Sequence, residues 1–430
     1  MTRRKALLQG SFWAVAQTVL RVGIGLVSVP LTIGYLGTER YGLWMTALSL
    51  NAFLTFLDIG LTPTLMNRMA EAHAQGDSEA FRRLAAAGMG VGAAIFATCA
   101  AVAGAALFLP WQSLLHIHDP LAIREAPRLV AVLVLAYAAG TALAGVEGVF
   151  AARLQVVKPR VYSFAAALCA FGLLLVGVRL RAGLPLLALL TSTTTALYRL
   201  PLLAELWLRE PLLLRPRWFE LKPILQALLP VSALYVGIQA SSVVMSSLPN
   251  VVLAREVSLA QVASFSVAMR VVGIPLSLVT AMVPVVWPAF TVAWARGETG
   301  WLRRRLWLAA QGTIALLSLF VLVMAFIGPG LVRWWTHGKA DVPPALLVAL
   351  GGWMIAQALV HWLSTFLHSI TDFRFEIFCF AASALLTLAL AIPLTRARGP
   401  VGLALAMALA LTAGSLVPMA LRTRRKLSVS

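Results

Sequence analysis

The sequence predicts an all-α integral membrane protein with about 12 transmembrane helices in two six-helix bundles, related by pseudo-two-fold symmetry around a central cavity. Three observations predict this fold class: the composition, the recurrence of long apolar runs, and an internal repeat of half the chain. Of the 430 residues, 60% are hydrophobic and 12% are charged, and the mean hydropathy is +0.87. These values lie far outside the range of soluble globular domains.

Apolar runs follow one another from Leu8 to Leu421, and each approaches the roughly 20 residues that a helix needs to cross a bilayer. In lipid, a backbone amide must be bonded within its own segment, so these runs are predicted to be helices and not strands. The twelve predicted spans are residues 11–34, 42–66, 85–110, 129–150, 161–178, 184–206, 224–252, 261–293, 306–329, 345–367, 376–394 and 400–421.

The formal charge of +19 raises the question of a nucleic-acid partner, which the distribution of the basic residues answers. With the N-terminus inside, the segments on the cytoplasmic side hold 22 of the 35 Lys and Arg residues, and the opposite side holds 10. This bias is typical of the positive-inside rule. We therefore predict a multi-pass protein of the bacterial cytoplasmic (inner) membrane with both termini cytoplasmic, and no nucleic-acid partner.

The three cysteines, Cys99, Cys169 and Cys379, all fall inside apolar runs and lack the spacing of metal ligands. They are expected to be buried small hydrophobic residues. The sequence therefore predicts no metal, no cofactor and no disulfide framework.

The second half of the chain repeats features of the first. At an offset of 217 residues, Leu8, Gln9, Leu36 and Glu39 align with Leu225, Gln226, Leu253 and Glu256, and at 221 Gly76-Asp77 aligns with Gly297-Glu298. We predict an N-terminal six-helix bundle over residues 1–210 and a C-terminal one over 211–430. An even number of helices in each half makes the repeats parallel, an arrangement common in alternating-access transporters.

Polar residues recur on one face of several predicted helices. Arg21 lies about ten residues, roughly 15 Å, from either end of its span, too deep for its side chain to reach an interface easily. The polar stripes of the first, second, sixth, seventh and eighth helices supply the candidate substrate-binding residues of the cavity, which are Arg21, Arg270, Asp58, Arg199, Gln17, Asn51, Tyr235 and Gln239.

Two interpretations of these stripes are open. Arg21 or Arg270 could pair with Asp58 in a dry interior, or the stripes could line a solvated lumen. Three arginines against one deep carboxylate favour the lumen, because unpaired intramembrane charges usually mark a substrate path. His361 is deep enough to carry a proton, although a lone helical histidine is more often a packing or hydrogen-bonding residue.

Several short motifs add to this pattern. In the first two helices they are Leu36-Gly37, Tyr41-Gly42-Leu43-Trp44, Asp58-Ile59-Gly60-Leu61, Asn67-Arg68, Glu71 and Gly76-Asp77. In the second half they are Ala263-Ser264-Phe265, Arg270, Trp287-Pro288-Ala289 and Gly297-Glu298, with Phe265 where Tyr is expected. These residues resemble the polysaccharide transporter family, the O-antigen flippase (Wzx-type) branch of the multidrug/oligosaccharidyl-lipid/polysaccharide exporter superfamily.

The resemblance implies a flippase that moves an undecaprenyl-pyrophosphate-linked oligosaccharide across the cytoplasmic membrane by alternating access in surface polysaccharide biosynthesis. Its partners would be the lipid-linked oligosaccharide, membrane lipids, and polysaccharide polymerase and chain-length machinery. Arg21 and Arg270 could share the diphosphate through forked hydrogen bonds, with Gln17, Asn51, Tyr235 and Gln239 left for the sugar.

Two alternatives remain. A cation-coupled multidrug antiporter of the same superfamily would need buried carboxylates, and only Asp58 is expected to lie deep. A membrane glycosyltransferase or polymerase would need acids or bases converging in a large extramembrane loop, and the predicted loops are short. We therefore expect a transporter and not an enzyme.

Overall fold

The computed structural model describes residues 3–58, 61–153, 155, 157–214 and 218–429. These residues form helices at each of the twelve predicted spans, and the described ranges contain no strand. Eight of the described helical segments are long and apolar enough to cross a membrane. Two of the eight each overlap two predicted spans, because one continues through the non-helical residue Gly37 and the other through Gly399. The predicted all-α membrane fold is confirmed.

The chain divides into two compact units, which do not follow the sequence order throughout. Unit 1 comprises residues 1–35 and 50–239, and unit 2 comprises residues 36–49 and 240–430. The helix α1 (Arg3–Ala52) therefore contributes to both. The boundary predicted between residues 210 and 211 stays a prediction.

Unit 1 contains most of α1, the first part of α11 and the shorter helices between them. These shorter helices are η1 (Phe53–Asp58), α2 (Leu61–Gln75), α3 (Ser78–Ala106), α4 (Trp111–Leu115), α5 (Pro120–Ala142), α6 (Ala144–Ala152), α7 (Val157–Arg179), α8 (Leu184–Ala188), η2 (Leu189–Thr193), α9 (Thr194–Leu197), α10 (Leu200–Arg209) and η3 (Pro211–Leu214). Within it, α3 packs against α2, α5 and α6. Gly92 lets α3 approach α5 closely, since a Cβ there would lie 2.6 Å from the Ala142 carbonyl oxygen.

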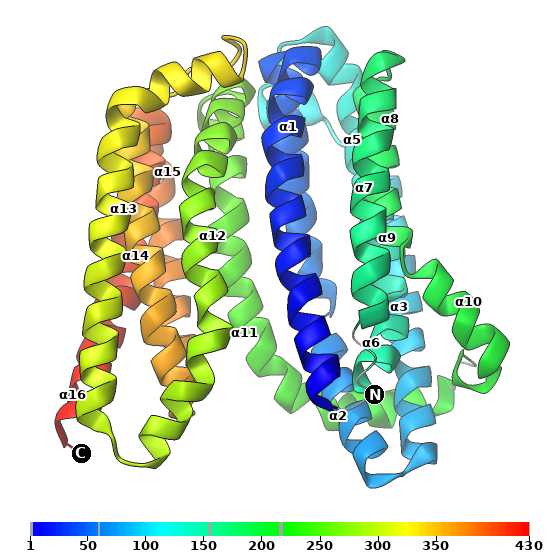
Figure 1. Cartoon of the computed structure of the whole chain (residues 1–430). Coiled ribbons are helices and arrows are strands. Elements are labelled where there is room, and N and C mark those ends of the chain that lie inside the picture. Colours follow the sequence, from blue (N-terminus) through cyan, green and yellow to red (C-terminus); the bar gives the residue numbers. More distant parts are fainter. Residues whose placement is uncertain (1–2, 59–60, 154, 156, 215–217, 430) are drawn as a thin grey trace. The chain divides into compact units, whose positions relative to one another are not determined.

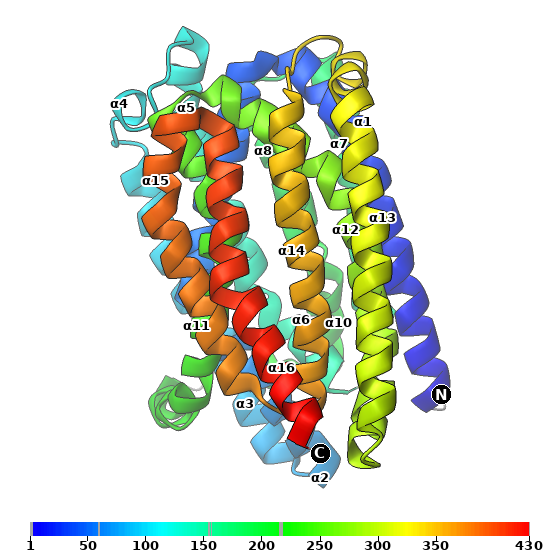
Figure 2. The same cartoon turned by 90° about the vertical axis from the view of Figure 1, so that its left-hand side faces the viewer.

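Unit 2 is centred on one helix. Its helices are the part of α11 (Trp218–Glu256) from residue 240 onward, α12 (Leu259–Ala295), α13 (Thr299–Trp335), α14 (Pro344–Ser369), α15 (Phe373–Leu411), η4 (Thr412–Leu416) and α16 (Val417–Val429). α14 packs against α12, α13 and α15, as Figure 1 and Figure 2 both show. The chain reverses at Gly399, where φ is +58°, so α15 consists of two helices joined by a turn.

The two turns aligned by the internal repeat have the same local structure. Gly76 and Gly297 both adopt positive φ, +73° and +72°, a conformation that glycine adopts without steric penalty. After each glycine, the amide of the next residue bonds back five positions, from Asp77 to Ala72 at 3.0 Å and from Glu298 to Ala293 at 2.9 Å. The two turns therefore end their first helix in the same way, as a repeat requires. The next helices begin differently, since the Asp77 side chain accepts from the Ala80 amide whereas the Glu298 side chain makes no such cap.

Residues 36–49, which carry the Leu36-Gly37 and Tyr41-Gly42-Leu43-Trp44 motifs, pack within unit 2. Tyr41 and Leu43 are almost completely buried, and Asn250 Nδ2 donates to Ser49 Oγ at 2.9 Å. Gly42 lies directly against the start of α12, where a Cβ would overlap the Leu259 carbonyl group. The motif therefore has a packing role in addition to its family signature.

One cysteine differs from the prediction. Cys99 and Cys379 are buried, but Cys169 on α7 is exposed. In a membrane protein an exposed apolar face is turned to lipid, where a thiol is tolerated as a small hydrophobic group.

Gly42→Ala should destabilise unit 2, because the added methyl group overlaps the backbone of Leu259 rather than a movable side chain. We expect a loss of about 2 kcal/mol or more, measured as a lower melting temperature of the purified protein in detergent. Gly273→Ala is the matched control, since no atom lies within 4 Å of its Cβ position. Equal melting temperatures for the two variants would contradict this packing.

The ends of α6 and α10 are joined by a bidentate ion pair. Arg153 Nη1 and Nη2 donate to the two carboxylate oxygens of Glu210 at 2.6 and 2.7 Å. These hydrogen bonds lower the pKa of Glu210 below its ordinary value of 4.5, although partial burial opposes the shift. Because the folded-state pKa is depressed, the pair stabilises the fold at neutral pH, and this contribution disappears as pH falls through the folded pKa.

Glu210→Gln should therefore reduce stability at pH 7 by at most about 1 kcal/mol, since the carboxylate is solvent-screened. The difference from the wild type should vanish on acidification to about pH 3. Thermal melts at both pH values measure it, and Glu298→Gln, in a looser pair 3.9 Å from Arg296, is the control. A Glu210→Gln deficit that persists in acid would contradict the assignment.

Candidate substrate-binding cavity

Three interruptions of the helices meet in unit 1. α1 ends at Ala52 and gives way to the tighter turn η1. α5 and α6 are separated by Leu143, and the sixth predicted span is broken into α8, the π-helical η2, α9 and α10. At membrane depth, irregular backbone is tolerated only where it is buried in protein or lines a wet cavity. The breaks therefore mark the place where a polar site can form.

A cavity of about 390 Å³ lies at these breaks. It is lined by Asn51, Leu133, Ala136, Tyr137, Gly140, Thr141, Ala144, Ser192, Ala196 and Arg199. Two of the predicted site residues, Asn51 and Arg199, are thus brought together although they are far apart in the sequence. The lining combines small residues with hydroxyl, amide and guanidinium groups, which suits a polar ligand or ordered water.

Arg199 is held in place by an ion pair with Glu147. Its Nη2 lies 2.8 Å from Glu147 Oε2, its Nε donates to the same oxygen at 2.8 Å, and Nη1 donates to the Gly140 carbonyl at 3.2 Å. The Tyr198 hydroxyl also donates to Glu147 Oε2, at 2.6 Å. Pro201, which follows Leu200 at the start of α10, prevents a continuous helix here and leaves Arg199 at the break.

This pairing corrects one expectation. Arg199 was counted among three arginines opposed by a single deep carboxylate, but Glu147 balances its charge. Two side chains, Tyr198 and Arg199, hold the Glu147 carboxylate in place. The cavity therefore has a fixed, neutralised ion pair in its wall, and the predicted excess of positive charge cannot come from Arg199.

Asn51 has a free acceptor. Its Oδ1 is buried and has no hydrogen-bond partner among the described residues. A buried carbonyl oxygen without a partner is unfavourable by about 1–3 kcal/mol, so it is usually satisfied by water or a ligand. Asn51 accordingly offers the cavity an unused hydrogen-bonding position.

Asp58 has a local role at the start of α2. Its Oδ1 accepts from the Thr62 backbone amide at 3.2 Å and from the Thr62 hydroxyl at 2.6 Å. It also lies close enough to Tyr137 to interact electrostatically with that side chain. No ion pair joins Asp58 to an arginine in the part of the chain that the structure describes.

The two residues predicted on the first helix differ in their surroundings. Arg21 is exposed and forms no ion pair with any described residue, and its charge acts on the Tyr198 hydroxyl beside Arg199. Gln17 instead donates to Ser163 Oγ at 2.6 Å and joins α1 to α7. Arg21 therefore has an uncommitted guanidinium, whereas the Gln17 amide already has a structural partner.

The predicted residues of the second half lie on α11 and α12. Arg270 is exposed, has no ion pair among the described residues, and interacts electrostatically with buried Tyr41 of unit 2. Gln239 is half-buried on α11. The side chain of Tyr235 lies outside the described residues. That these groups and Arg21 face one chamber stays a prediction.

A buried acidic cluster in unit 2 was missed by the sequence analysis. Glu376 is 5% exposed. It accepts a hydrogen bond from Ser364, and its Oε2 lies 2.6 Å from His368 Nε2. The available signal was the spacing of His368 and Glu376 across a tight turn at Thr371, where φ is +58°. His361, the histidine that was predicted as a candidate, instead contacts Gln357 at 3.4 Å.

The family model described as "Polysaccharide biosynthesis protein" matches residues 7–294. The chain belongs to this family. The predicted resemblance to the polysaccharide transporters is therefore confirmed. No curated protein matches the chain.

Several solved structures share the fold of this chain. The lipid II flippase MurJ in an inward closed conformation has a TM-score of 0.73 at 14% identity, covering 97% of this chain and 90% of MurJ. An inward-facing multidrug resistance MATE family transporter of the MOP superfamily has a TM-score of 0.68 at 17% identity, covering 95% and 98%. A MOP superfamily transporter from Pyrococcus furiosus has a TM-score of 0.59 at 15% identity, covering 99% and 96%. These relatives are transporters and flippases, not enzymes, and the polysaccharide biosynthesis chain shares their multi-pass fold.

Glu147→Ala should destabilise this family member, because it leaves the Arg199 guanidinium, only 20% exposed, without its carboxylate. We expect a loss of about 2 kcal/mol, seen as a lower melting temperature in detergent. The double variant Glu147→Ala/Arg199→Ala should recover part of that loss, since it removes the unpaired charge as well. Lys158→Ala, in the more exposed pair with Glu205, should change stability by less than about 1 kcal/mol. Equal losses in Glu147→Ala and Lys158→Ala would contradict the structural role of the Arg199 pair.

Proposed function

We propose that the protein is a flippase that moves an undecaprenyl-pyrophosphate-linked oligosaccharide across the bacterial cytoplasmic membrane by alternating access. The cargo combines an anionic diphosphate, a polar glycan and an apolar tail. Membership of the polysaccharide biosynthesis family supports a glycan cargo, and the MOP-type fold supports transport. Both termini lie in the cytoplasm in this proposal, as the bias of basic residues predicts.

The observation that carries the proposal is the state of Arg21 and Arg270. Both lie within long apolar helices, both are exposed, and neither has an ion pair among the described residues. A guanidinium in an apolar span is unfavourable by about 3 kcal/mol or more unless it faces protein or water. An anionic diphosphate would satisfy both arginines through charge-assisted hydrogen bonds.

The cavity at the helix breaks suits the glycan part of the cargo. Its volume of about 390 Å³ is within the range of small-molecule sites, and Asn51 offers an acceptor without a partner. Arg199 has a different role here from Arg21, because its ion pair with Glu147 shapes the wall instead of binding phosphate. Polysaccharide polymerase and chain-length machinery would receive the translocated product.

Arg21→Ala and Arg270→Ala should each abolish complementation of a flippase-deficient strain at normal protein level, because each removes a phosphate partner. Lysine at the same positions should retain partial activity, since it keeps the charge but not the bidentate geometry. Arg255→Ala, at the exposed end of α11, is the matched control and should complement fully. Wild-type complementation by both Arg21→Ala and Arg270→Ala would refute the proposed diphosphate site.

A cation-coupled multidrug antiporter is the second candidate, favoured by the fold shared with the MATE family transporter. The two functions differ in cargo charge, so two assays in proteoliposomes separate them. Translocation of a labelled lipid-linked oligosaccharide supports the flippase. Proton- or sodium-dependent efflux of a cationic dye, without lipid translocation, supports the antiporter.

A further inference from the structure

Unit 2 contains a large groove that none of the predicted substrate residues lines. It has a volume of about 1000 Å³ and lies between the first turns of α13, the middle of α14 and the last turns of the chain on η4 and α16. Leu306, Ile314, Leu363 and Leu416 are among its apolar walls. Its volume far exceeds the roughly 30 Å³ of a water molecule, so it is large enough for a sizeable ligand.

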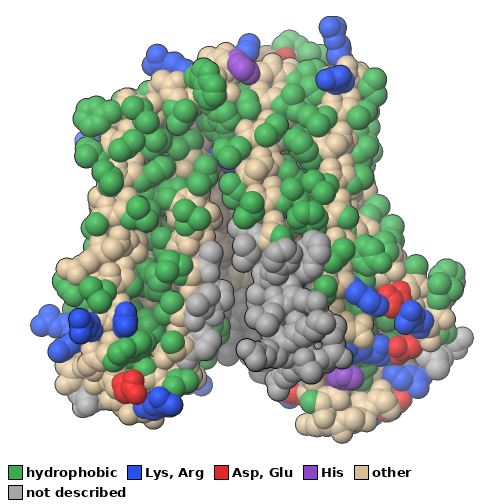
Figure 3. Space-filling view, viewed as in Figure 1, with side chains coloured by type: hydrophobic (Ala, Val, Ile, Leu, Met, Phe, Trp, Pro, Cys, Tyr) green, Lys and Arg blue, Asp and Glu red, His purple; other side chains and the backbone are tan. Residues whose placement is uncertain are grey.

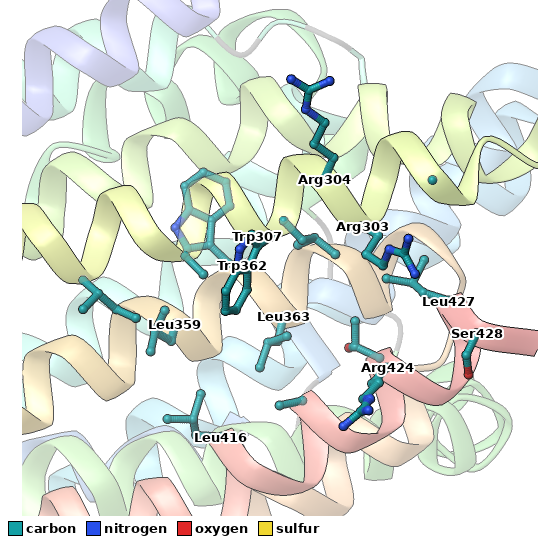
Figure 4. A pocket seen from close by; sticks show the side chains of 16 residues that line it. Arg303, Arg304, Trp307, Leu359, Trp362, Leu363, Leu416, Arg424, Leu427 and Ser428 are labelled. Carbon is teal, nitrogen blue, oxygen red and sulfur yellow. The ribbon is translucent and has the colours of Figure 1, made fainter.

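The groove is amphipathic along its length. Figure 4 shows Arg303, Arg424 and Ser428 toward one end, Leu359 toward the other, and Trp307 and Trp362 between them. Figure 3 shows Lys and Arg side chains gathered at the lower end of the same unit, below a mainly hydrophobic surface. Tryptophan and arginine in this order are typical of the boundary between the hydrocarbon and the aqueous phase.

The polar end has unused binding capacity. Arg303 and Arg424 are exposed and form no ion pair with any described residue, and no acidic residue lines the groove. Thr423, which also lines it, is only 5% exposed, yet its hydroxyl has no hydrogen-bond partner within the described chain. A buried hydroxyl normally bonds a backbone carbonyl of its own helix or a ligand. Arg303, Arg424 and the Thr423 hydroxyl therefore lie at one end of an apolar trough, each without a partner among the described residues.

We propose that this groove binds an anionic phospholipid of the cytoplasmic leaflet, with its phosphate between Arg303 and Arg424 and an acyl chain along the apolar walls. The two arginines favour an anionic headgroup, because basic pockets between transmembrane helices bind anionic lipid phosphates. The long apolar part of the groove favours a lipid over a soluble anion, because an acyl chain can fill it. The bound lipid would be a resident of unit 2, not the transported cargo, because Arg270 lies on α12 outside the groove.

The test is native mass spectrometry of the purified full chain titrated with phosphatidylglycerol and, separately, phosphatidylcholine. We expect saturable binding that prefers phosphatidylglycerol. Arg303→Gln/Arg424→Gln should weaken phosphatidylglycerol binding by about 30-fold, from roughly fivefold for each arginine. Arg425→Ala is the matched control, since Arg425 is the exposed neighbour of Arg424 and does not line the groove.

A second variant distinguishes binding inside the groove from electrostatic attraction of lipid to the basic surface. Ala420→Trp fills the trough and leaves both arginines in place, so it too should lose phosphatidylglycerol binding. Melting temperatures without lipid verify that each variant is folded. Unchanged binding in Arg303→Gln/Arg424→Gln or in Ala420→Trp would overturn the proposal. Displacement of bound phosphatidylglycerol from the wild type by equimolar undecaprenyl diphosphate would also overturn it, because the groove would then belong to the cargo lipid.

Discussion

The constraint on which this structure depends is that a lipid bilayer offers no hydrogen-bond partners to an interrupted helix. Unit 1 nevertheless interrupts its helices after Ala52, at Leu143 and around Arg199. All three interruptions border one cavity, and the freed backbone is used there, since the Gly140 carbonyl accepts from Arg199. The helix breaks therefore supply backbone groups that line the cavity, and the polar cavity in turn satisfies those groups.

The arginines of the apolar helices fall into two groups with different physical roles. Arg199 is neutralised by Glu147 and fixed by three contacts, so its charge is part of the protein's own framework. Arg21 and Arg270 have no such partner among the described residues. A substrate that brings negative charge would complete their environment, and the proposed flippase mechanism depends on this difference.

Much of the fold could be predicted from the sequence, because apolar runs of membrane length admit few structures. The breaks inside those runs could not, since residues 42–66 read as one apolar helix while η1 interrupts it at Phe53–Asp58. The ion pair between Glu147 and Arg199 could not be predicted from the sequence either. The two residues are 52 positions apart, and only the packing of their helices brings them together. Glu376 was missed because its burial comes from α14 and not from its own helix.

The internal repeat was detectable because its turns need particular residues. Gly76 and Gly297 adopt a positive φ, which other residues rarely do, so glycine is expected at both turns. The Tyr41-Gly42-Leu43-Trp44 motif was read only as a family signature, and its packing against the start of α12 became visible only in three dimensions.

The central claim, that the cavity at the helix breaks is open to water in the membrane, can be measured by cysteine accessibility. In a Cys169→Ser background, which removes the one exposed native thiol, Asn51→Cys and Ser192→Cys should react with a membrane-impermeant thiosulfonate in sealed vesicles. Leu174→Cys, at a buried site on α7, should not. Failure of both cavity cysteines to react from either side of the membrane would mean that the interior is dry, and would contradict the account.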